Sequence, residues 1–156
     1  MVWAGICKTG KTPLVFVDTG VKINKDIYLR EILQGVLEPW ARGHFGNRPF
    51  LFQQDSAPAH RAREVQTWCR GHLPFFISAQ EWPPYSPDIN PMDYSVWSIL
   101  ESRACSTPHK NLDSLRRALI EEWDKMSLDE VRRIVENFPK RLRLCIKAKG
   151  GHFETS

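Results

Sequence analysis

The sequence has no long apolar run, and no basic region precedes an apolar stretch at its start. A membrane-spanning helix needs roughly 20 consecutive apolar residues, so no membrane span is predicted. The missing basic region argues against a secretory signal peptide. Internal repeats and low-complexity segments are also missing, which favours one continuous domain over residues 1–156.

Cysteine is scarce, with four residues that lie far apart and form no C-x-x-C pair. This spacing argues against a disulfide framework and is typical of a reduced, intracellular protein with incidental thiols. Cys69 and His72 form a single C-x-x-H pair, and a structural zinc site normally needs a second pair. We therefore expect no zinc site.

The composition that remains is that of a globular domain, with 42% hydrophobic and 26% charged residues. The net charge is +4, and part of the excess is concentrated near the end of the chain. Such a basic segment suits a nucleic acid backbone, although a solvated cluster at a helix end has the same composition. The basic residues of this segment are Lys140, Arg141, Arg143, Lys147 and Lys149.

Hydrophobic periodicity predicts four short strands and five helices. The strands are expected at residues 2–6, 13–17, 49–53 and 74–78, the first two joined as a hairpin. The helices are expected at residues 25–45, from about 58, from 90, at 111–126 and from 127. Pro139 should bend or end the last helix. This order favours a mixed α/β fold with helices packed against a sheet.

The helical stripes also predict which side chains form the core. The first two helices should bury Ile27, Leu29, Ile32, Leu33, Val36, Leu37 and Trp40, followed by Ala62, Val65, Trp68 and Cys69. The last two should bury Leu112, Leu115, Leu119 and Trp123, then Val131, Ile134, Val135 and Phe138, with Leu142, Cys145 and Ile146 beyond Pro139.

The sequence contains one formal match to a nucleotide-binding motif. Residues 5–12 (GICKTGKT) fit the spacing of a phosphate-binding loop. Such a loop needs a helix N-terminus directly after it, and here a second hairpin strand is predicted instead. The match is therefore interpreted as coincidental.

Two acidic residues occupy positions that suit metal-dependent chemistry. Asp55 follows a predicted buried strand, and Asp93 lies in the first turn of a helix that Asn90 and Pro91 begin. Each could be purely structural, Asp55 as a helix cap and Asp93 as an acid at the positive helix end. Together, across a proline-stiffened connector, the two carboxylates can point at one Mg²⁺ or Mn²⁺ ion.

Residues 52–60 (FQQDSAPAH) and 82–93 (WPPYSPDINPMD) resemble the signatures around the second and third catalytic acids of mariner-type transposases of the Tc/mariner superfamily. Residues 2–6 and 146–152 also resemble family stretches, in matching order. The resemblance implies a ribonuclease H-like fold in which three carboxylates hold two divalent metals for DNA strand cleavage and transfer. Asp55 and Asp93 would be the catalytic, metal-binding second and third acids.

The resemblance also implies what these 156 residues do not contain. The first acid should lie on a strand upstream of Val2, and Asp18 is not expected to replace it. The family's N-terminal DNA-binding helix-turn-helix region has no counterpart either. We therefore expect a sheet without its first strand, at most one weakly bound Mg²⁺ or Mn²⁺, and a chain that is inactive or severely impaired alone. Whether it is an enzyme by itself is left open.

The partners implied are the transposon ends and the target DNA, with a homodimer possible in the full-length family. A nuclear location is expected, with no small-molecule cofactor and no membrane. The alternatives are a domesticated remnant that binds DNA or protein without chemistry, and a non-functional product of a decayed element. His60 could contact Asp55 or substrate, or could be an ordinary core or surface histidine. Trp82 and Tyr85 could stack on bases or pack against the sheet.

Overall fold

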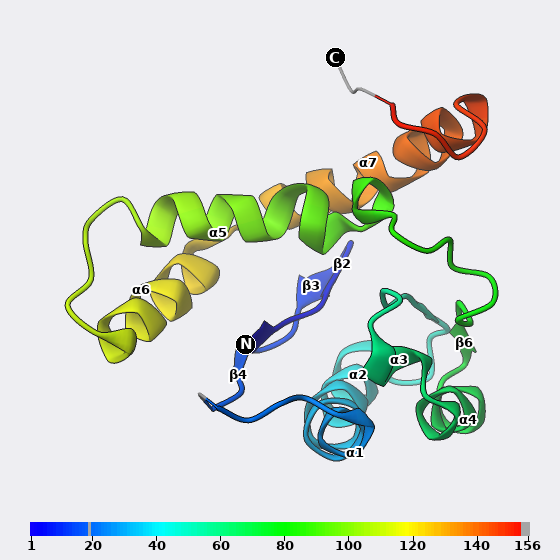
Figure 1. Cartoon of the computed structure of the whole chain (residues 1–156), viewed down its shortest axis with the longest axis horizontal. Helices are drawn as coiled ribbons and strands as arrows, with labels where there is room; N and C mark the ends of the chain where they lie inside the picture. Colours follow the sequence, from blue (N-terminus) through cyan, green and yellow to red (C-terminus); the bar gives the residue numbers. More distant parts are fainter. Residues whose placement is uncertain (19, 154–156) are drawn as a thin grey trace. The chain divides into compact units, whose positions relative to one another are not determined.

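A computed structural model describes residues 1–18 and 20–153 (Figure 1). The chain divides into two compact units. The first unit contains Met1–Ala4 and Val15–Ser86, and the second contains Gly5–Leu14 and the chain from Pro87 onward. One continuous domain therefore stays a prediction. Throughout the described residues, every helix is too short or too polar to span a bilayer.

The first unit contains two strand pairs. Strand β1 (Val2–Trp3) pairs antiparallel with β4 (Val15–Phe16), whereas β5 (Leu51–Phe52) pairs parallel with β6 (Phe75–Phe76). All four strands lie inside the predicted ranges. The two pairs are not hydrogen-bonded to each other in the described residues.

Three consecutive helices follow the first strands: α1 (Lys25–Ile27), the π-helix η1 (Tyr28–Leu37) and α2 (Glu38–Phe45). They confirm the helix predicted over residues 25–45. Asn24 begins it, because its side-chain oxygen accepts the backbone N–H groups of Asp26 and Ile27. The π-helix η1 ends at Leu37, two residues before Pro39, which has no N–H group to donate to a helical hydrogen bond.

The core of the first unit forms between η1 and α4 (Arg63–His72), which follows the short helix α3 (Pro58–Arg61). The periodicity identified most of this core, and it missed Tyr28 and Leu73, which are 1% and 8% exposed. Parallel strands β5 and β6 flank these helices, and Phe52 and Phe76 pack against the core. The buried members are Tyr28, Ile32, Leu33, Leu37, Val65, Trp68, Cys69 and Leu73.

Strands β5 and β6 also carry an exposed apolar pair. Leu51 and Phe75 are register partners and are 61% and 60% exposed. Exposed strand pairs with apolar side chains favour self-association. We expect light scattering to show association that rises with concentration and is reduced by Leu51→Lys with Phe75→Gln. Leu128→Lys, at another exposed leucine, is the control, and a monomeric wild type at high concentration would contradict this prediction.

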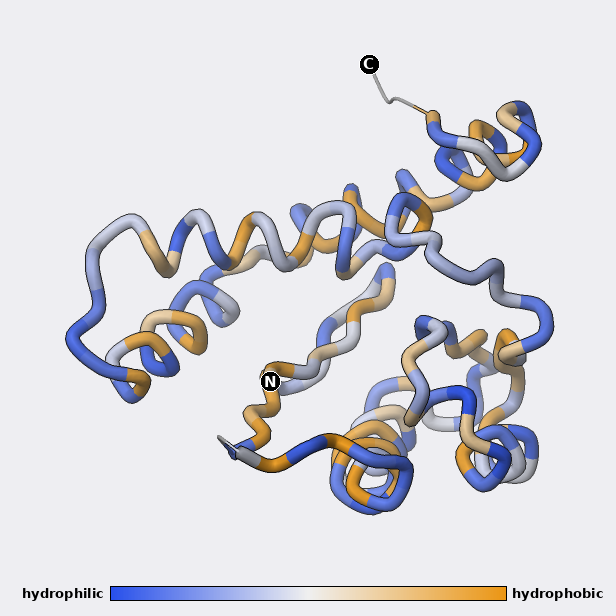
Figure 2. Tube along the Cα trace, in the orientation of Figure 1, coloured by the Kyte–Doolittle hydropathy of each residue, from blue (hydrophilic) through white to orange (hydrophobic). Residues whose placement is uncertain are grey.

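The second unit combines a small hairpin with helices. Strand β2 (Ile6–Cys7) pairs with β3 (Gly10–Lys11), so the predicted hairpin is present but divides between the two units at residues 4–5 and 14–15. The helices are η2 (Pro87–Ile89), η3 (Met92–Val96), α5 (Trp97–Ala104), α6 (Leu112–Lys125) and α7 (Leu128–Lys147). Polar and apolar residues alternate along α6 and α7 (Figure 2), as expected of helices with one buried face.

Side chains cap the starts of α6 and α7. The Asn111 side chain accepts the Ser114 N–H, and the Ser127 side chain accepts the Glu130 N–H. Two details of the predicted core were wrong. Leu112 and Ile146 are 55% and 76% exposed because each lies at a helix end, beyond the packed middle turns. Pro139 lies inside α7, which continues to Lys147, so of the two predicted effects of this proline the helix end is excluded.

Lys11, which lies in the formal phosphate-loop match, contacts the end of helix α6. Its ammonium group donates to the carbonyl oxygens of Trp123 and, at 2.8 Å, of Met126, and it lies 5.0 Å from the centre of the Trp123 ring. These carbonyls end helix α6, where a cation is favourable. Trp123 in turn donates its indole N–H to the Thr12 carbonyl at 2.9 Å. The motif therefore ties the hairpin to α6, in agreement with the interpretation of the sequence.

Candidate active site

Asp55 lies three residues after β5, at the carboxyl end of that strand. Its Oδ1 atom accepts the Ala57 backbone N–H at 2.9 Å, which closes a tight turn before α3. The same oxygen lies 2.6 Å from His60 Nδ1. The Asp55 side chain is 46% exposed, so it accepts the Ala57 N–H, contacts His60 and still faces solvent.

A buried polar network supports the Asp55–His60 pair. The His60 ring lies against the Tyr28 ring with centroids 4.1 Å apart. Tyr28 donates its hydroxyl to Gln54 Oε1 at 2.6 Å, and Gln66 donates its amide to the His60 carbonyl at 2.9 Å. His60 therefore packs against Tyr28, and its Nδ1 atom faces Asp55. Of the two interpretations of His60, the structure favours contact with Asp55.

The close contact with His60 Nδ1 is the main reason that the pKa of Asp55 is lowered, and the Ala57 N–H adds to this effect while burial opposes it. An aspartate with a lowered pKa stabilises the fold above the pH at which an unfolded aspartate titrates. That contribution is lost as the pH falls through the folded-state pKa. Because Asp55 is nearly half exposed, we expect this contribution to the free energy of unfolding to be below about 1 kcal/mol.

Replacing His60 with alanine should raise the pKa of Asp55 toward its ordinary value, because the strongest donor to the carboxylate is removed. Carbon-detected NMR titration of the Asp55 carboxyl measures this shift. His72→Ala is a matched control, since His72 stacks on Trp68 and does not contact Asp55. An Asp55 pKa that is the same in His60→Ala and the wild type would contradict this role for His60.

Asp93 lies in the first turn of η3, in the second unit, and is exposed. Asn90 caps this turn as predicted: its side-chain oxygen accepts the Met92 N–H at 3.2 Å, and its carbonyl accepts the Asp93 and Tyr94 N–H groups at 3.0 and 2.9 Å. The next residue, Tyr94, has its pKa raised to about 12 by burial, so its hydroxyl stays protonated and can donate.

The two carboxylates suit a hard divalent cation, since both are exposed and carboxylate oxygens are the ligands that Mg²⁺ and Mn²⁺ prefer. Within the described residues, no group of three or more His, Cys, Asp and Glu side chains is placed to hold a metal. Asp55 belongs to the first unit and Asp93 to the second. Their convergence on one ion therefore stays a prediction.

Other residues singled out in the sequence have clear places. Trp82 is buried at 6% exposure, so it packs rather than stacking on a ligand. Tyr85 is 99% exposed with φ 52°, so packing against the sheet is wrong for this residue. Burial raises the pKa of the Cys69 thiol to about 11, which disfavours the thiolate that a zinc ligand requires.

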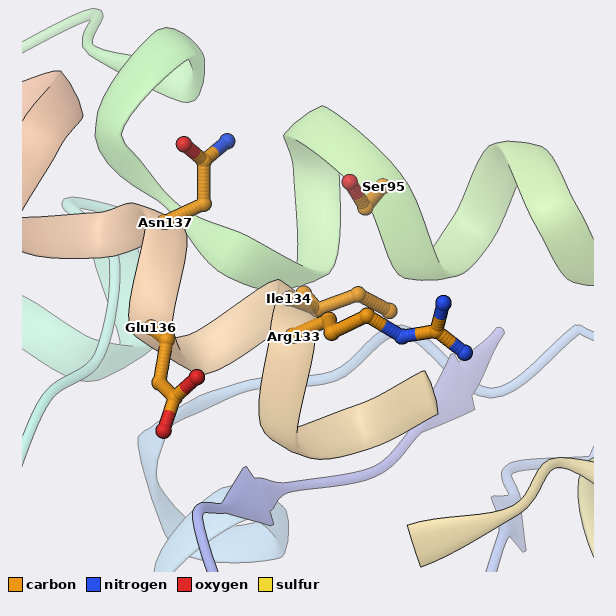
Figure 3. Close-up of a pocket in the computed structure, with 5 residues that line it drawn as sticks. All are labelled: Ser95, Arg133, Ile134, Glu136 and Asn137. Carbon is orange, nitrogen blue, oxygen red and sulfur yellow. The ribbon is translucent and has the colours of Figure 1, made fainter. Parts of the chain in front are cut away.

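An open pocket of about 410 Å³ lies between η3 and α7 in the second unit (Figure 3). Its charged groups are of both signs, and Glu136 pairs with Lys8 at 2.9 Å. The pocket contains neither predicted acid, so it is not the predicted metal site. Its lining residues are Ser95, Arg133, Ile134, Glu136 and Asn137.

Comparison with curated sequences shows similarity to transposases along nearly the whole chain. The chain is 32% identical over 150 residues to the transposable element Tcb1 transposase of Caenorhabditis briggsae, which covers 96% of this chain and 52% of that protein. It is 29% identical over 151 residues to the Tc1 transposase of Caenorhabditis elegans, with the same coverage. The chain thus spans about half the length of the curated relatives it matches. No family model matches it.

Solved structures of one transposase share the fold. A pre-cleavage Mos1 transpososome superposes with a TM-score of 0.82 at 23% identity, covering 98% of this chain and 44% of that one. The Mos1 catalytic domain, solved with Raltegravir and Mn, gives 0.79 at 21% identity, covering 94% and 74%. These matches confirm the predicted fold. The chain is therefore similar in sequence to the Tcb1 and Tc1 transposases, and it has the ribonuclease H-like fold of the Mos1 catalytic domain.

Proposed function

We propose that this chain is part of a transposase catalytic domain that cleaves DNA strands and joins them to a target in a divalent-metal-dependent reaction. The observation that carries the proposal is the similarity over 150 residues to proteins named as transposases. Mos1 structures with Mn, with Mg and in a paired-end complex with a transposon end support metal ions and DNA as partners. A nuclear location and a homodimer of the complete protein are part of the same proposal.

The proposed metal ligands are Asp55 and Asp93. A bound divalent ion would stabilise charge on the phosphate and activate the attacking oxygen. In this proposal, Asp55 binds the ion while His60 and Ala57 hold its Oδ1 atom in place. Asp93 supplies a second carboxylate from a turn that the Asn90 cap fixes. Both carboxylates are exposed at the ends of ordered elements, as a site that receives a DNA strand requires.

The 156 residues alone are proposed to be inactive or severely impaired. A two-metal site needs enough carboxylate oxygens to bridge two ions and to offset their mutual repulsion. Two carboxylates suffice for at most one ion, and Mg²⁺ with so few protein ligands keeps most of its water and binds weakly. A third acid on an additional strand would complete the site.

The second candidate is a DNA-binding module without chemistry. The favouring observation is that four basic residues near the end of the chain are exposed. If DNA binding is their role, the affinity for duplex DNA should fall steeply with salt, because each phosphate contact releases a counterion. These residues are Lys140, Arg143, Lys147 and Lys149.

A nicking assay on supercoiled DNA with Mn²⁺ tests the leading proposal. The 156-residue chain is compared with the same chain extended at its N-terminus by a strand carrying an aspartate from a homologous transposase. We expect metal-dependent nicking from the extended chain only. Salt-dependent binding by both proteins, with nicking by neither, would favour the DNA-binding module instead.

A further inference from the structure

The turn that carries Asp93 is short and receives support from another part of the chain. It follows the proline-rich connector and starts a π-helix of only five residues, Met92–Val96. The helix that supports it is α7, from which two residues contact the segment from Asp88 to Tyr94. All of these residues belong to the second unit.

Arg141 makes the main contacts. Its guanidinium donates to the Asp88 carbonyl at 2.8 Å, and its central carbon lies 4.0 Å from the centre of the Tyr94 ring. The Arg141 guanidinium therefore contacts Asp88 and Tyr94, on the two sides of the Asn90 cap. A guanidinium can stack on a ring and donate in its own plane at the same time, whereas an ammonium group cannot.

Tyr94 carries the restraint to the acid. Its hydroxyl donates to the Ile134 carbonyl on α7 at 2.6 Å, while its ring packs under Arg141. Asp93 is the adjacent residue, so fixing the Tyr94 backbone also fixes the direction in which the Asp93 side chain leaves the helix. The same segment has a further neighbour, because His152 Nδ1 lies 3.9 Å from the Asp88 carboxylate.

We propose that Arg141 is a positioning residue for Asp93, which it acts on through Tyr94 and Asp88. This inference rests on the proposed function, because it gives Asp93 the role of a metal ligand. Residues that orient a metal ligand commonly change metal affinity by about 10–100-fold when they are removed. Arg141 therefore has a different role from the exposed basic residues around it, although all of them belong to one basic segment.

The test uses the 156-residue chain with Arg141→Met, Arg141→Lys and, as a matched control, Arg143→Met at an exposed position in the same helix. NMR measures hydrogen exchange of the Asp93 and Tyr94 amides, and Mn²⁺ titration measures the broadening of their signals. We expect exchange to be about tenfold faster in Arg141→Met, with a Mn²⁺ midpoint about tenfold higher. Arg141→Lys should fall between wild type and Arg141→Met, and Arg143→Met should match the wild type.

Two results would overturn the proposal. One is exchange in Arg141→Met as slow as in Arg143→Met. The other is an unchanged Mn²⁺ midpoint in Arg141→Met while Asp93→Asn abolishes the Mn²⁺ effect, because Arg141 would then only stabilise the fold. If Arg141→Met does not fold, Arg141→Lys decides by the same criteria. A Mn²⁺ effect that Asp93→Asn leaves intact would refute the metal role of Asp93, and the exchange rates would still show whether Arg141 holds this turn.

Discussion

Replacing either Asp55 or Asp93 with asparagine is expected to reduce Mn²⁺-dependent nicking by the strand-extended chain by about 10³-fold or more. Asparagine keeps the size of the side chain and removes its negative charge, so a metal ligand is lost while the local fold is kept. A 10³-fold loss corresponds to about 4 kcal/mol of transition-state stabilisation. Residues that act as one unit are strongly non-additive, so the double variant should be little worse than either single variant.

The matched control for this result is Asp113→Asn. Asp113, like Asp93, is an exposed acid in the first turn of a helix, here α6. If Asp93 acted only on the helix dipole, both substitutions would have similarly small effects. Nicking by the unextended chain at a rate that neither Asp55→Asn nor Asp93→Asn changes would refute the assignment of this site.

Trp123→Ala is expected to destabilise the second unit by about 3–5 kcal/mol, the usual cost of removing a buried tryptophan side chain. Trp123 is 2% exposed, donates to the Thr12 carbonyl and lies beside the Lys11 ammonium group. Its removal leaves a cavity and also releases the hairpin from the end of α6. Urea denaturation followed by circular dichroism measures the free energy of unfolding.

Two further variants separate the contributions of Trp123. Trp123→Phe keeps most of the buried ring and loses the indole donor, so its cost should be clearly smaller than that of alanine. Ile120→Ala, at a 42% exposed position of the same helix, should cost little. Equal destabilisation by Trp123→Ala and Ile120→Ala would show that Trp123 does not join the hairpin to α6.

Local patterns in the sequence were sufficient for the helices and their caps. Ser127 caps α7 because its side-chain oxygen accepts the Glu130 N–H, and the local order of residues contains that information. The burial of Tyr28 and the exposure of Leu112 were missed. Tyr28 is buried because Gln54 accepts its hydroxyl hydrogen bond, which no helical stripe reveals.

The candidate site was predicted only in part, because only some of its contacts are local in the sequence. The surroundings of Asp55 are local, since Ala57 and His60 follow it within five residues. A turn of this kind can be inferred from the order of residues, and the contact with His60 was one of two readings. The support of Asp93 is not local, because Arg141 reaches Asp88 across 53 positions of the chain. A single sequence gives no sign of that pairing, so Arg141 was grouped with the other basic residues.

The convergence of Asp55 and Asp93 on one divalent ion is the central claim, and a crystal structure of the strand-extended chain grown with Mn²⁺ tests it most directly. Anomalous scattering locates the ion without reference to its ligands. We predict Mn²⁺ bound by both carboxylates, with the carboxyl groups on the order of 5–8 Å apart. Carboxyl groups more than about 15 Å apart, or Mn²⁺ bound to other residues only, would contradict the assignment, since one metal cluster cannot span that distance.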